Sequence, residues 1–170
     1  MKLVVAVDKE WGIGNKGELL ARVRADLRNF RALTEGHVVV LGSKTLATFP
    51  GGRPLKNRTN IVLSRNPDYA PEGATTARSI DELLEILKGY DTDDVYIIGG
   101  ESIYTQMLPY CDTAYVTKFD KSFQKDAVMP SLDESDEWVL SEVGETLVSD
   151  SEIDSEADMQ FSFCTYKRIK

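Results

Sequence analysis

The sequence is poor in the residues that build disulfide scaffolds and metal centres. Among 170 residues it has 2 cysteines and 1 histidine, too few for a disulfide framework or for the ligand spacing of a zinc site. Cys111 and Cys164 fit a reducing compartment, and His37, which precedes the apolar run 38–41, is interpreted as the start of a strand. We therefore expect no metal.

The sequence also has no excess of positive charge. The formal net charge is −8, which argues against nucleic acid as a partner. The balance is uneven, because residues 22–65 are rich in lysine and arginine with only the acids Asp26 and Glu35, whereas residues 133–158 are strongly acidic. A basic stretch on an acidic protein indicates a local site for an anionic small molecule.

Long hydrophobic runs are absent as well. No run reaches the ~18 apolar residues of a membrane-spanning helix. Residues 1–7 are apolar only over the length of a strand and lack a signal-peptide cleavage pattern. With 42% hydrophobic residues the chain can fill one substantial core. We expect one soluble cytoplasmic domain over residues 1–170, with no membrane partner.

Short apolar runs alternate with helical patterns over residues 1–108. The runs are almost continuously apolar, as in strands buried on both faces of a parallel sheet. Ser79 followed by Glu82 has the spacing of a capping box at the start of a helix. The predicted strands are 3–7, 38–41, 61–63 and 95–98, and the predicted helices are 25–34, 80–88 and 101–108.

Residues 113–169 follow a different pattern. The segments 113–119, 138–148 and 159–169 are longer, alternate between apolar and polar residues and have no helix between them, which is typical of antiparallel strands. Residues 149–158, rich in acids and serine, are predicted to be a solvated hairpin loop. The fold class is therefore α/β: a doubly wound, mostly parallel sheet with an antiparallel C-terminal edge and helices on both faces.

Asp26 is the most unusual residue of the predicted helix 25–34. At ~100° per residue it points the same way as Phe30 and Leu33, whereas Arg28 and Arg31 face away. Burying a carboxylate without a partner is costly or raises its pKa. Two interpretations stay open: an ordinary acid in the first turn that meets the helix dipole, or an acid kept to bind a ligand or deliver a proton.

Two predicted strands end in glycine directly before a helix. Gly99 and Gly100 follow the strand 95–98, and Gly42 follows the strand 38–41. Glycine lets a ligand approach the backbone, and the N–H groups of a following helix can bind phosphate. Neither motif is a P-loop, and each can also be a simple tight turn. The side chains after Gly42 that suit a pyrophosphate are those of Ser43, Lys44 and Thr45.

Arginines stand at both ends of another strand. Arg58 precedes the strand 61–63, and Arg65 follows it. A guanidinium binds carboxylates and phosphates in a bidentate way, although both arginines can also be solvated surface charges. The glycine-rich segment 11–17 follows the first strand and is suited to act as a lid or as an ordinary turn.

In sequence order, these motifs together resemble dihydrofolate reductase. The resemblance implies a single doubly wound domain with a central eight-stranded sheet. It implies an enzyme that reduces 7,8-dihydrofolate to 5,6,7,8-tetrahydrofolate with NADPH and supplies one-carbon metabolism, as a cytoplasmic monomer that antifolate inhibitors bind. The segments that carry it are 6–14, the helix with Asp26 and Phe30, 42–45, 52–64 with Arg58, and 98–100 with Tyr104.

The resemblance also implies the substrate contacts. Asp26 would bind the pterin ring and promote protonation of its N5 atom, with Thr117 supporting the acid. Arg58 would hold the α-carboxylate of the glutamate tail. The other substrate residues implied are Val4, Val5, Leu27, Phe30, Leu55 and Ile98.

The implied NADPH site is larger. Ala6 and Ile13 would flank the nicotinamide, and Gly42, Ser43, Lys44 and Thr45 would hold the pyrophosphate. Leu63, Ser64 and Arg65 would line the adenosine end. Ser64 and Arg65, with Lys44 or Arg78, would meet the 2′-phosphate. The nicotinamide and pyrophosphate path would be lined by Gly99, Gly100, Ser102, Ile103 and Tyr104.

The chain departs from the family pattern at two positions. Ser43 stands where the family often has arginine, and Ala21 stands where it commonly has a tryptophan that organises an active-site water. Two rival functions remain on the sequence alone. One is an NADPH-dependent pyrimidine reductase of riboflavin synthesis, and the other is a non-catalytic module that binds NADP(H) or folate.

Overall fold

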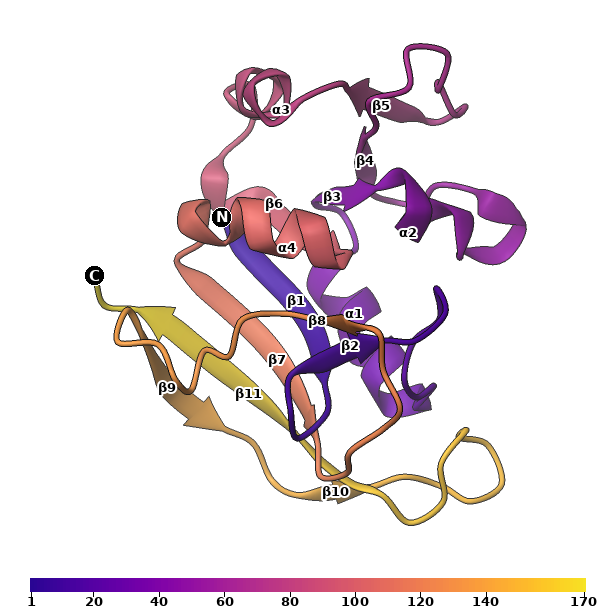
Figure 1. Ribbon diagram of the computed structural model, residues 1–170, viewed down its shortest axis with the longest axis vertical. Coiled ribbons are helices and arrows are strands. Elements are labelled where there is room, and N and C mark those ends of the chain that lie inside the picture. Colours follow the sequence, from indigo (N-terminus) through magenta and orange to yellow (C-terminus); the bar gives the residue numbers. More distant parts are fainter. The chain divides into compact units, whose positions relative to one another are not determined.

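Each of the two structural units of this protein is built from two separate stretches of chain. The computed structural model describes all residues 1–170 (Figure 1). The first unit contains Met1–Leu3 and Thr34–Tyr110, and the second contains Val4–Leu33 and Cys111–Lys170. The expectation of one domain over residues 1–170 stays a prediction.

The first unit is a parallel sheet. Its strands are β3 (Val38–Gly42), β4 (Thr59–Leu63), β5 (Ala74–Ala77) and β6 (Val95–Gly99), and the start of β1 (Lys2–Val7) lies beside β6, with Leu3 opposite Ile97. All neighbouring pairs in this unit are parallel, in the order β1-β6-β3-β4-β5. The valine and isoleucine runs form these strands because a sheet covered on both faces needs apolar side chains on both.

Short helices follow the strands of the first unit. They are α2 (Ser43–Ala47), α3 (Ile80–Leu87) and α4 (Glu101–Met107), with the 3₁₀ turns η1 (Pro50–Gly52), η2 (Thr92–Asp94) and η3 (Leu108–Tyr110). Ser79 caps α3 as predicted, because its hydroxyl accepts from the Glu82 N–H at 3.1 Å. The Glu82 carboxylate instead accepts from the Arg78 N–H, one residue before the cap.

The second unit holds the antiparallel strands and one long helix. Besides helix α1 (Arg24–Thr34), it contains β7 (Thr113–Phe119), β9 (Trp138–Val143), β10 (Leu147–Val148) and β11 (Gln160–Arg168), and a small sheet of β2 (Gly12–Gly14) and β8 (Ala127–Val128). In Figure 1 the orange and yellow strands β9 and β11 run side by side next to β7. The hairpin predicted around residues 149–158 connects β10 to β11.

One predicted strand, 138–148, is interrupted. The structure divides it into β9 and β10, with Gly144 in the break. A Cβ atom on Gly144 would lie 2.9 Å from the carbonyl oxygen of Phe163, so this close approach to β11 requires glycine. Alternation of residue types does not signal such a break.

The strand order confirms the predicted fold class. Along the sheet it is β10-β11-β7-β1-β6-β3-β4-β5, eight strands, and β9 pairs in addition with β11. The sheet is mostly parallel and has antiparallel strands from the C-terminal part of the chain. Strand β5 and the small β2–β8 sheet were not predicted, since they are short and only partly buried. None of the helices is long and apolar enough to cross a membrane.

Candidate active site

Asp26 lies on α1 with its carboxylate directed at β7. Helix α1 begins at Arg24, so Asp26 is in its first turn, and the side chain is nevertheless 9% exposed. The Thr117 hydroxyl donates to Asp26 Oδ1 at 2.6 Å. Both interpretations of the sequence therefore apply in part: the acid does meet the helix N-terminus, and it is also buried against a donor from a distant strand.

Burial decides the acidity of Asp26. Desolvation raises its pKa from 3.8 to about 6, and the hydrogen bond from Thr117 only partly opposes that shift. A carboxylate held by several donors would move in the other direction. Asp26 thus exchanges its proton close to neutral pH, as an acid–base group in a reaction must.

The acidic loop 149–158 holds the start of α1. Asp154 Oδ1 accepts from the Arg24 N–H at 2.8 Å, and the Ser155 hydroxyl accepts from the Arg22 N–H at 2.7 Å. Asp154 thereby satisfies a backbone donor at the helix N-terminus that would otherwise lack a partner in the helix. The loop was predicted as a solvated connection, and most of its residues are exposed. Its contacts with the helix that carries Asp26 were not predicted.

Ala21 belongs to the core of the second unit. It is buried with Val23, Phe119, Met159 and Phe161, and Ala6 packs against this cluster. The small side chain in place of the tryptophan common in the family is therefore part of an apolar cluster.

A second buried acid, Asp8, organises the glycine-rich first loop. It is 1% exposed, and its carboxylate accepts from the N–H groups of Gly12 at 2.8 Å, Glu10 at 2.9 Å and Phe123 at 3.1 Å. The Lys125 ammonium is 2.9 Å from Asp8 Oδ2. Burial would raise the pKa of Asp8, but Lys125 and the three N–H groups together hold it below its ordinary value.

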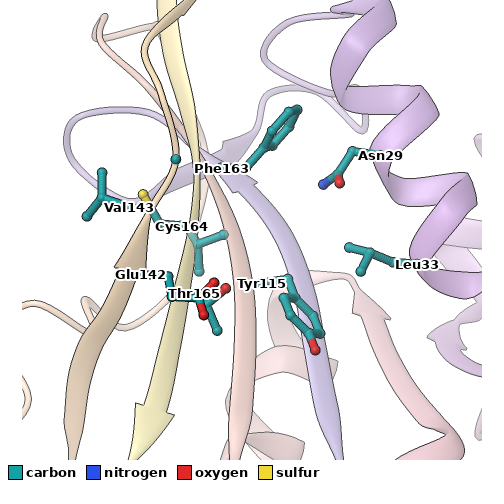
Figure 2. Close-up of a pocket in the computed structure, with 10 residues that line it drawn as sticks. Asn29, Leu33, Tyr115, Glu142, Val143, Phe163, Cys164 and Thr165 are labelled. Atoms are coloured by element: carbon teal, nitrogen blue, oxygen red, sulfur yellow. The ribbon is translucent and has the colours of Figure 1, made fainter.

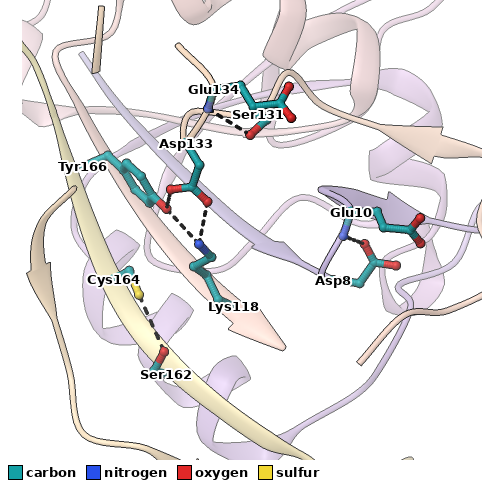
Figure 3. Close-up of polar contacts among 9 residues, drawn as sticks. All are labelled: Asp8, Glu10, Lys118, Ser131, Asp133, Glu134, Ser162, Cys164 and Tyr166. Atoms are coloured by element: carbon teal, nitrogen blue, oxygen red, sulfur yellow. Dashed lines mark hydrogen bonds and ion pairs between the residues drawn. The ribbon is translucent and has the colours of Figure 1, made fainter. Parts of the chain in front are cut away.

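The stem of Lys125 explains why glycine stands at position 12. A Cβ atom there would lie 2.3 Å from Cδ of Lys125. Next to this loop, Lys118 donates to Asp133 at 2.7 Å and the Tyr166 hydroxyl donates to Asp133 at 2.6 Å (Figure 3). Trp11 packs with its ring edge-on to Tyr166, at 5.7 Å between ring centroids. The first loop is thus attached to β7 and β11 and is not an isolated turn.

In the first unit, the two glycine-initiated helices start side by side. Gly42 is the N-cap of α2 and Gly100 is the N-cap of α4, and their parent strands β3 and β6 are neighbours, with Leu41 opposite Gly99. A Cβ atom on Gly100 would lie 3.1 Å from Thr45 Oγ1. Gly99 has a φ of 125°, a region that favours glycine. Backbone groups that carry no side chain and the Thr45 hydroxyl therefore converge at one edge of the parallel sheet, as a phosphate site requires.

Arg58 is positioned before β4. Its Nε donates to Thr34 Oγ1 at 3.2 Å and its Nη1 donates to the Lys56 carbonyl at 2.7 Å. The buried Asn60 shapes the preceding loop, because its side chain accepts from the Leu55 N–H at 3.0 Å and donates to the Leu55 carbonyl at 2.9 Å. Asn60 was not singled out in the sequence, although a buried asparagine in an apolar strand is a recognisable signal.

At the end of β4, Arg78 supports the following turn. Its guanidinium donates to the carbonyls of Asn66 and Pro67, while the Ser64 N–H donates to the Ala77 carbonyl at 2.9 Å. Arg65 is exposed, and its side chain forms no hydrogen bond or ion pair. Arg65 is therefore better placed than Arg78 to offer its charge to a ligand.

The structure divides the predicted residues between the two units. The second unit contains the acid, its threonine and the first-strand residues, and the first unit contains the glycine turns and the arginines. Those in the second unit are Val4, Val5, Ala6, Ile13, Asp26, Leu27, Phe30 and Thr117; those in the first are Gly42, Ser43, Lys44, Thr45, Leu55, Arg58, Leu63, Ser64, Arg65, Arg78, Ile98, Gly99, Gly100, Ser102, Ile103 and Tyr104. Asp8 and Lys125 were missed, since their partners are distant in sequence.

Comparison with known proteins identifies the family. The family model for dihydrofolate reductase matches residues 1–168. The chain belongs to the dihydrofolate reductase family. It is 36% identical over 140 residues to the dihydrofolate reductase of Bacillus subtilis (strain 168), which covers 82% of this chain and 80% of the relative. It is 31% identical over 170 residues to that of Staphylococcus haemolyticus, covering 100% of this chain and 96% of the relative.

A solved dihydrofolate reductase has the same fold. The enzyme from Enterococcus faecalis, complexed with NADP(H) and RAB-propyl, superposes with a TM-score of 0.85 at 32% identity. The match covers 99% of this chain and 96% of that one. The family, and with it the α/β architecture, is the same in both proteins.

Proposed function

We propose that this member of the dihydrofolate reductase family reduces 7,8-dihydrofolate to 5,6,7,8-tetrahydrofolate with NADPH. The observation that carries the proposal is the buried Asp26 carboxylate, hydrogen-bonded by Thr117 and with a pKa of about 6. Such a group holds a polar heterocycle in a pocket and exchanges a proton at the pH of the reaction.

Asp26 acts as the pterin anchor in this proposal. Its carboxylate accepts hydrogen bonds from the N3 and 2-amino groups of the pterin, and the Thr117 hydroxyl keeps it oriented. A negative charge there stabilises the protonated pterin and so favours protonation of N5 through water. The other side chains proposed to contact the substrate are apolar, namely those of Val4, Val5, Leu27, Phe30, Leu55 and Ile98.

The glycine turns of the first unit fit a dinucleotide. Gly99 and Gly100 leave no side chain at the point where β6 ends and α4 begins. Thr45 Oγ1 lies 3.1 Å from where a Cβ atom of Gly100 would be. When bound, NADPH supplies the hydride that C6 of the pterin receives. Ser43, Lys44 and Thr45 bind its pyrophosphate, and Ser64 and Arg65 bind its 2′-phosphate in this proposal.

A steady-state assay with dihydrofolate, run with NADPH and with NADH, tests the activity. Faster turnover with NADPH is expected because Lys44 and Arg65 supply positive charge for a 2′-phosphate. No loss of dihydrofolate absorbance with either cofactor would contradict the proposal. The same result, combined with tight binding of both ligands, would support the non-catalytic module.

Arg58→Leu tests the substrate. We expect its KM for dihydrofolate to rise by about 30-fold, on the order of 2 kcal/mol for a carboxylate left without its guanidinium. Lys88→Met, an exposed lysine paired only with Glu85, is the matched control and should leave KM unchanged. A pyrimidine reductase of riboflavin synthesis would instead turn over its ribosyl-phosphate substrate and need no clamp for a glutamate tail.

The remaining proposals concern the setting of the enzyme. We infer a cytoplasmic monomer that acts on small molecules, takes antifolate inhibitors in the Asp26 pocket and supplies one-carbon metabolism. Both cysteines are buried and form no disulfide, as in proteins of reducing compartments. Sedimentation of the purified chain would test the monomer.

A further inference from the structure

The second unit contains a cavity that the proposed reaction does not use. It has a volume of about 450 Å³, within the usual range of small-molecule sites. Figure 2 shows it between helix α1 and the strands β7, β9 and β11. Neither Asp26 of α1 nor Thr117 of β7 lines it, although other residues of α1 and β7 do.

The register of the strands creates the cavity. Thr165 of β11 is opposite Tyr115 of β7 and also opposite Glu142 of β9. Strand β9 stops at Val143, because Gly144 turns inward and donates its N–H to the Phe163 carbonyl at 2.8 Å. The sheet surface under α1 is therefore covered only in part, and the space that remains is the cavity.

The walls combine apolar and polar groups. Leu33, Tyr115 and Phe163 provide apolar and aromatic surface, and Figure 2 shows Asn29 and Phe163 facing each other across the space. The Val143 side chain points away from helix α1. No protein group hydrogen-bonds the side chains of Asn29, Thr165 or Glu142, and Glu142 forms no ion pair. Glu142 is the only acid among the lining residues, and no lysine or arginine lines the cavity.

We propose that this cavity is a second ligand site, for a flat aromatic cation that carries an amidinium or protonated amino group. The ring fits against Phe163, Leu33 and Tyr115, since offset or edge-to-face packing on an aromatic side chain stabilises a bound ring. The cationic group donates to the Glu142 carboxylate, and the Thr165 hydroxyl and the Asn29 carbonyl accept its remaining N–H groups. The lining offers an unsatisfied charge of one sign only, so a cation is selected over an anion.

Benzamidine, with its neutral isostere benzamide as the comparison, tests the site. We expect benzamidine to bind the protein, without NADPH or folate, with a Kd of about 1 mM or tighter, and its titration in ¹⁵N–¹H spectra to move the amide signals of residues 142–144 and 163–165. Glu142→Gln should weaken benzamidine binding by about three- to fivefold, as expected for an exposed charge pair, and leave benzamide binding unchanged. Glu145→Gln, an exposed acid outside the cavity, is the matched control and should bind like the parent protein.

A variant that fills the cavity tests whether benzamidine binds there or at the proposed substrate site of Asp26. Asn29→Trp should abolish benzamidine binding, and its unfolding temperature shows whether the variant is folded. Asp26→Asn should keep the binding, and the opposite result would place the amidinium on Asp26 and overturn the proposal. Equal affinity in Glu142→Gln and the parent protein, or no binding to the parent, would also overturn it. Since no turnover is measured, failure of this proposal is distinguishable from failure of the proposed reductase activity.

Discussion

Asp8 and Asp26 are the same residue type in the same structural unit, buried to a similar degree, and yet their acidities move in opposite directions. Asp8 is 1% exposed and Asp26 is 9% exposed. The pKa of Asp8 lies below its ordinary value, whereas that of Asp26 is raised to about 6. Burial pushes both upward and acts more strongly on Asp26, where only Thr117 opposes it, whereas the donors around Asp8 outweigh its burial.

The donors define what each acid does. Asp8 has an ammonium and three backbone N–H groups, so its charge is satisfied and the acid holds the first loop in place. Asp26 has the hydroxyl of Thr117, which leaves lone pairs of the carboxylate for a ligand. A buried carboxylate with a full set of hydrogen-bond donors stabilises the fold, whereas one with few donors can bind a ligand or transfer a proton.

Replacing Asp26 should have the largest effect on activity. We expect Asp26→Asn to lose about 10²- to 10⁴-fold in turnover at neutral pH, the usual contribution of a positioned acid–base group. Activity should recover in part at low pH, where solvent protonates the substrate directly. A pH profile of kcat measures both, and full activity of the variant at pH 7 would refute the assignment.

The same substitution should stabilise the fold. The pKa of Asp26 is about 6 in the folded protein, against an ordinary value of 3.8. Between these pH values the folded state binds more protons, and stability falls as pH rises. At pH 7 the charged side chain then costs on the order of 2 to 3 kcal/mol. Urea unfolding of Asp26→Asn at pH 7 should show a gain of that order, which shrinks toward pH 4.

Replacing Asp8 should instead destabilise the fold. Asp8→Asn removes the carboxylate that accepts from three backbone N–H groups and from Lys125, which keeps Glu10 and the Phe123 carbonyl as partners. We expect a lower free energy of unfolding, and a smaller change in kcat than for Asp26→Asn. Because the pKa of Asp8 is lowered, its stabilisation is present above the ordinary pKa and is lost as pH falls through the lowered value.

A companion variant isolates the charge in this pair. Lys125→Met keeps a long apolar stem over Gly12 and removes the ammonium. Chemical denaturation should show an intermediate loss, since the three N–H groups remain on Asp8. Equal stability of Asp8→Asn and the parent protein would show that the two acids do not differ in the way proposed.

Of these variants, Thr117→Val should have the smallest effect. It should widen the difference between the pKa values of Asp26 and Asp8. Without the hydroxyl, burial acts unopposed and the pKa of Asp26 should rise above about 6, by up to about one unit. The pH profile of kcat should shift to higher pH by the same amount, with a modest decrease in its maximum. An unchanged profile would indicate that Thr117 does not tune the acid.

Much of the fold was predictable from local patterns. The strand 113–119 and the helix starting near residue 25 were predicted within one residue of β7 and α1, because their periodicity is set by neighbours along the chain. Ser79 was recognised as a helix cap for the same reason. The break at Gly144 was not predicted, since it depends on how closely β9 approaches the Phe163 carbonyl.

The site was predictable only in part. Asp26 stood out as an acid on an apolar helix face, and the glycine turns stood out at the ends of apolar runs. Asn60, Asp8 and Asp154 did not, because their importance lies in backbone groups of other segments that they hydrogen-bond. A polar residue in a loop carries no mark of the partner that will satisfy it.

Sequence periodicity and glycine placement determined the strands, the helices and the turns, since these depend on residues a few positions apart. The contrast between Asp8 and Asp26 was decided by tertiary structure alone. Thr117 lies 91 positions after Asp26, and Phe123 lies 115 positions after Asp8. Only folding brings these donors to the carboxylates, and the number that arrives at each one sets whether it is a fixed charge or an acid that titrates near neutral pH.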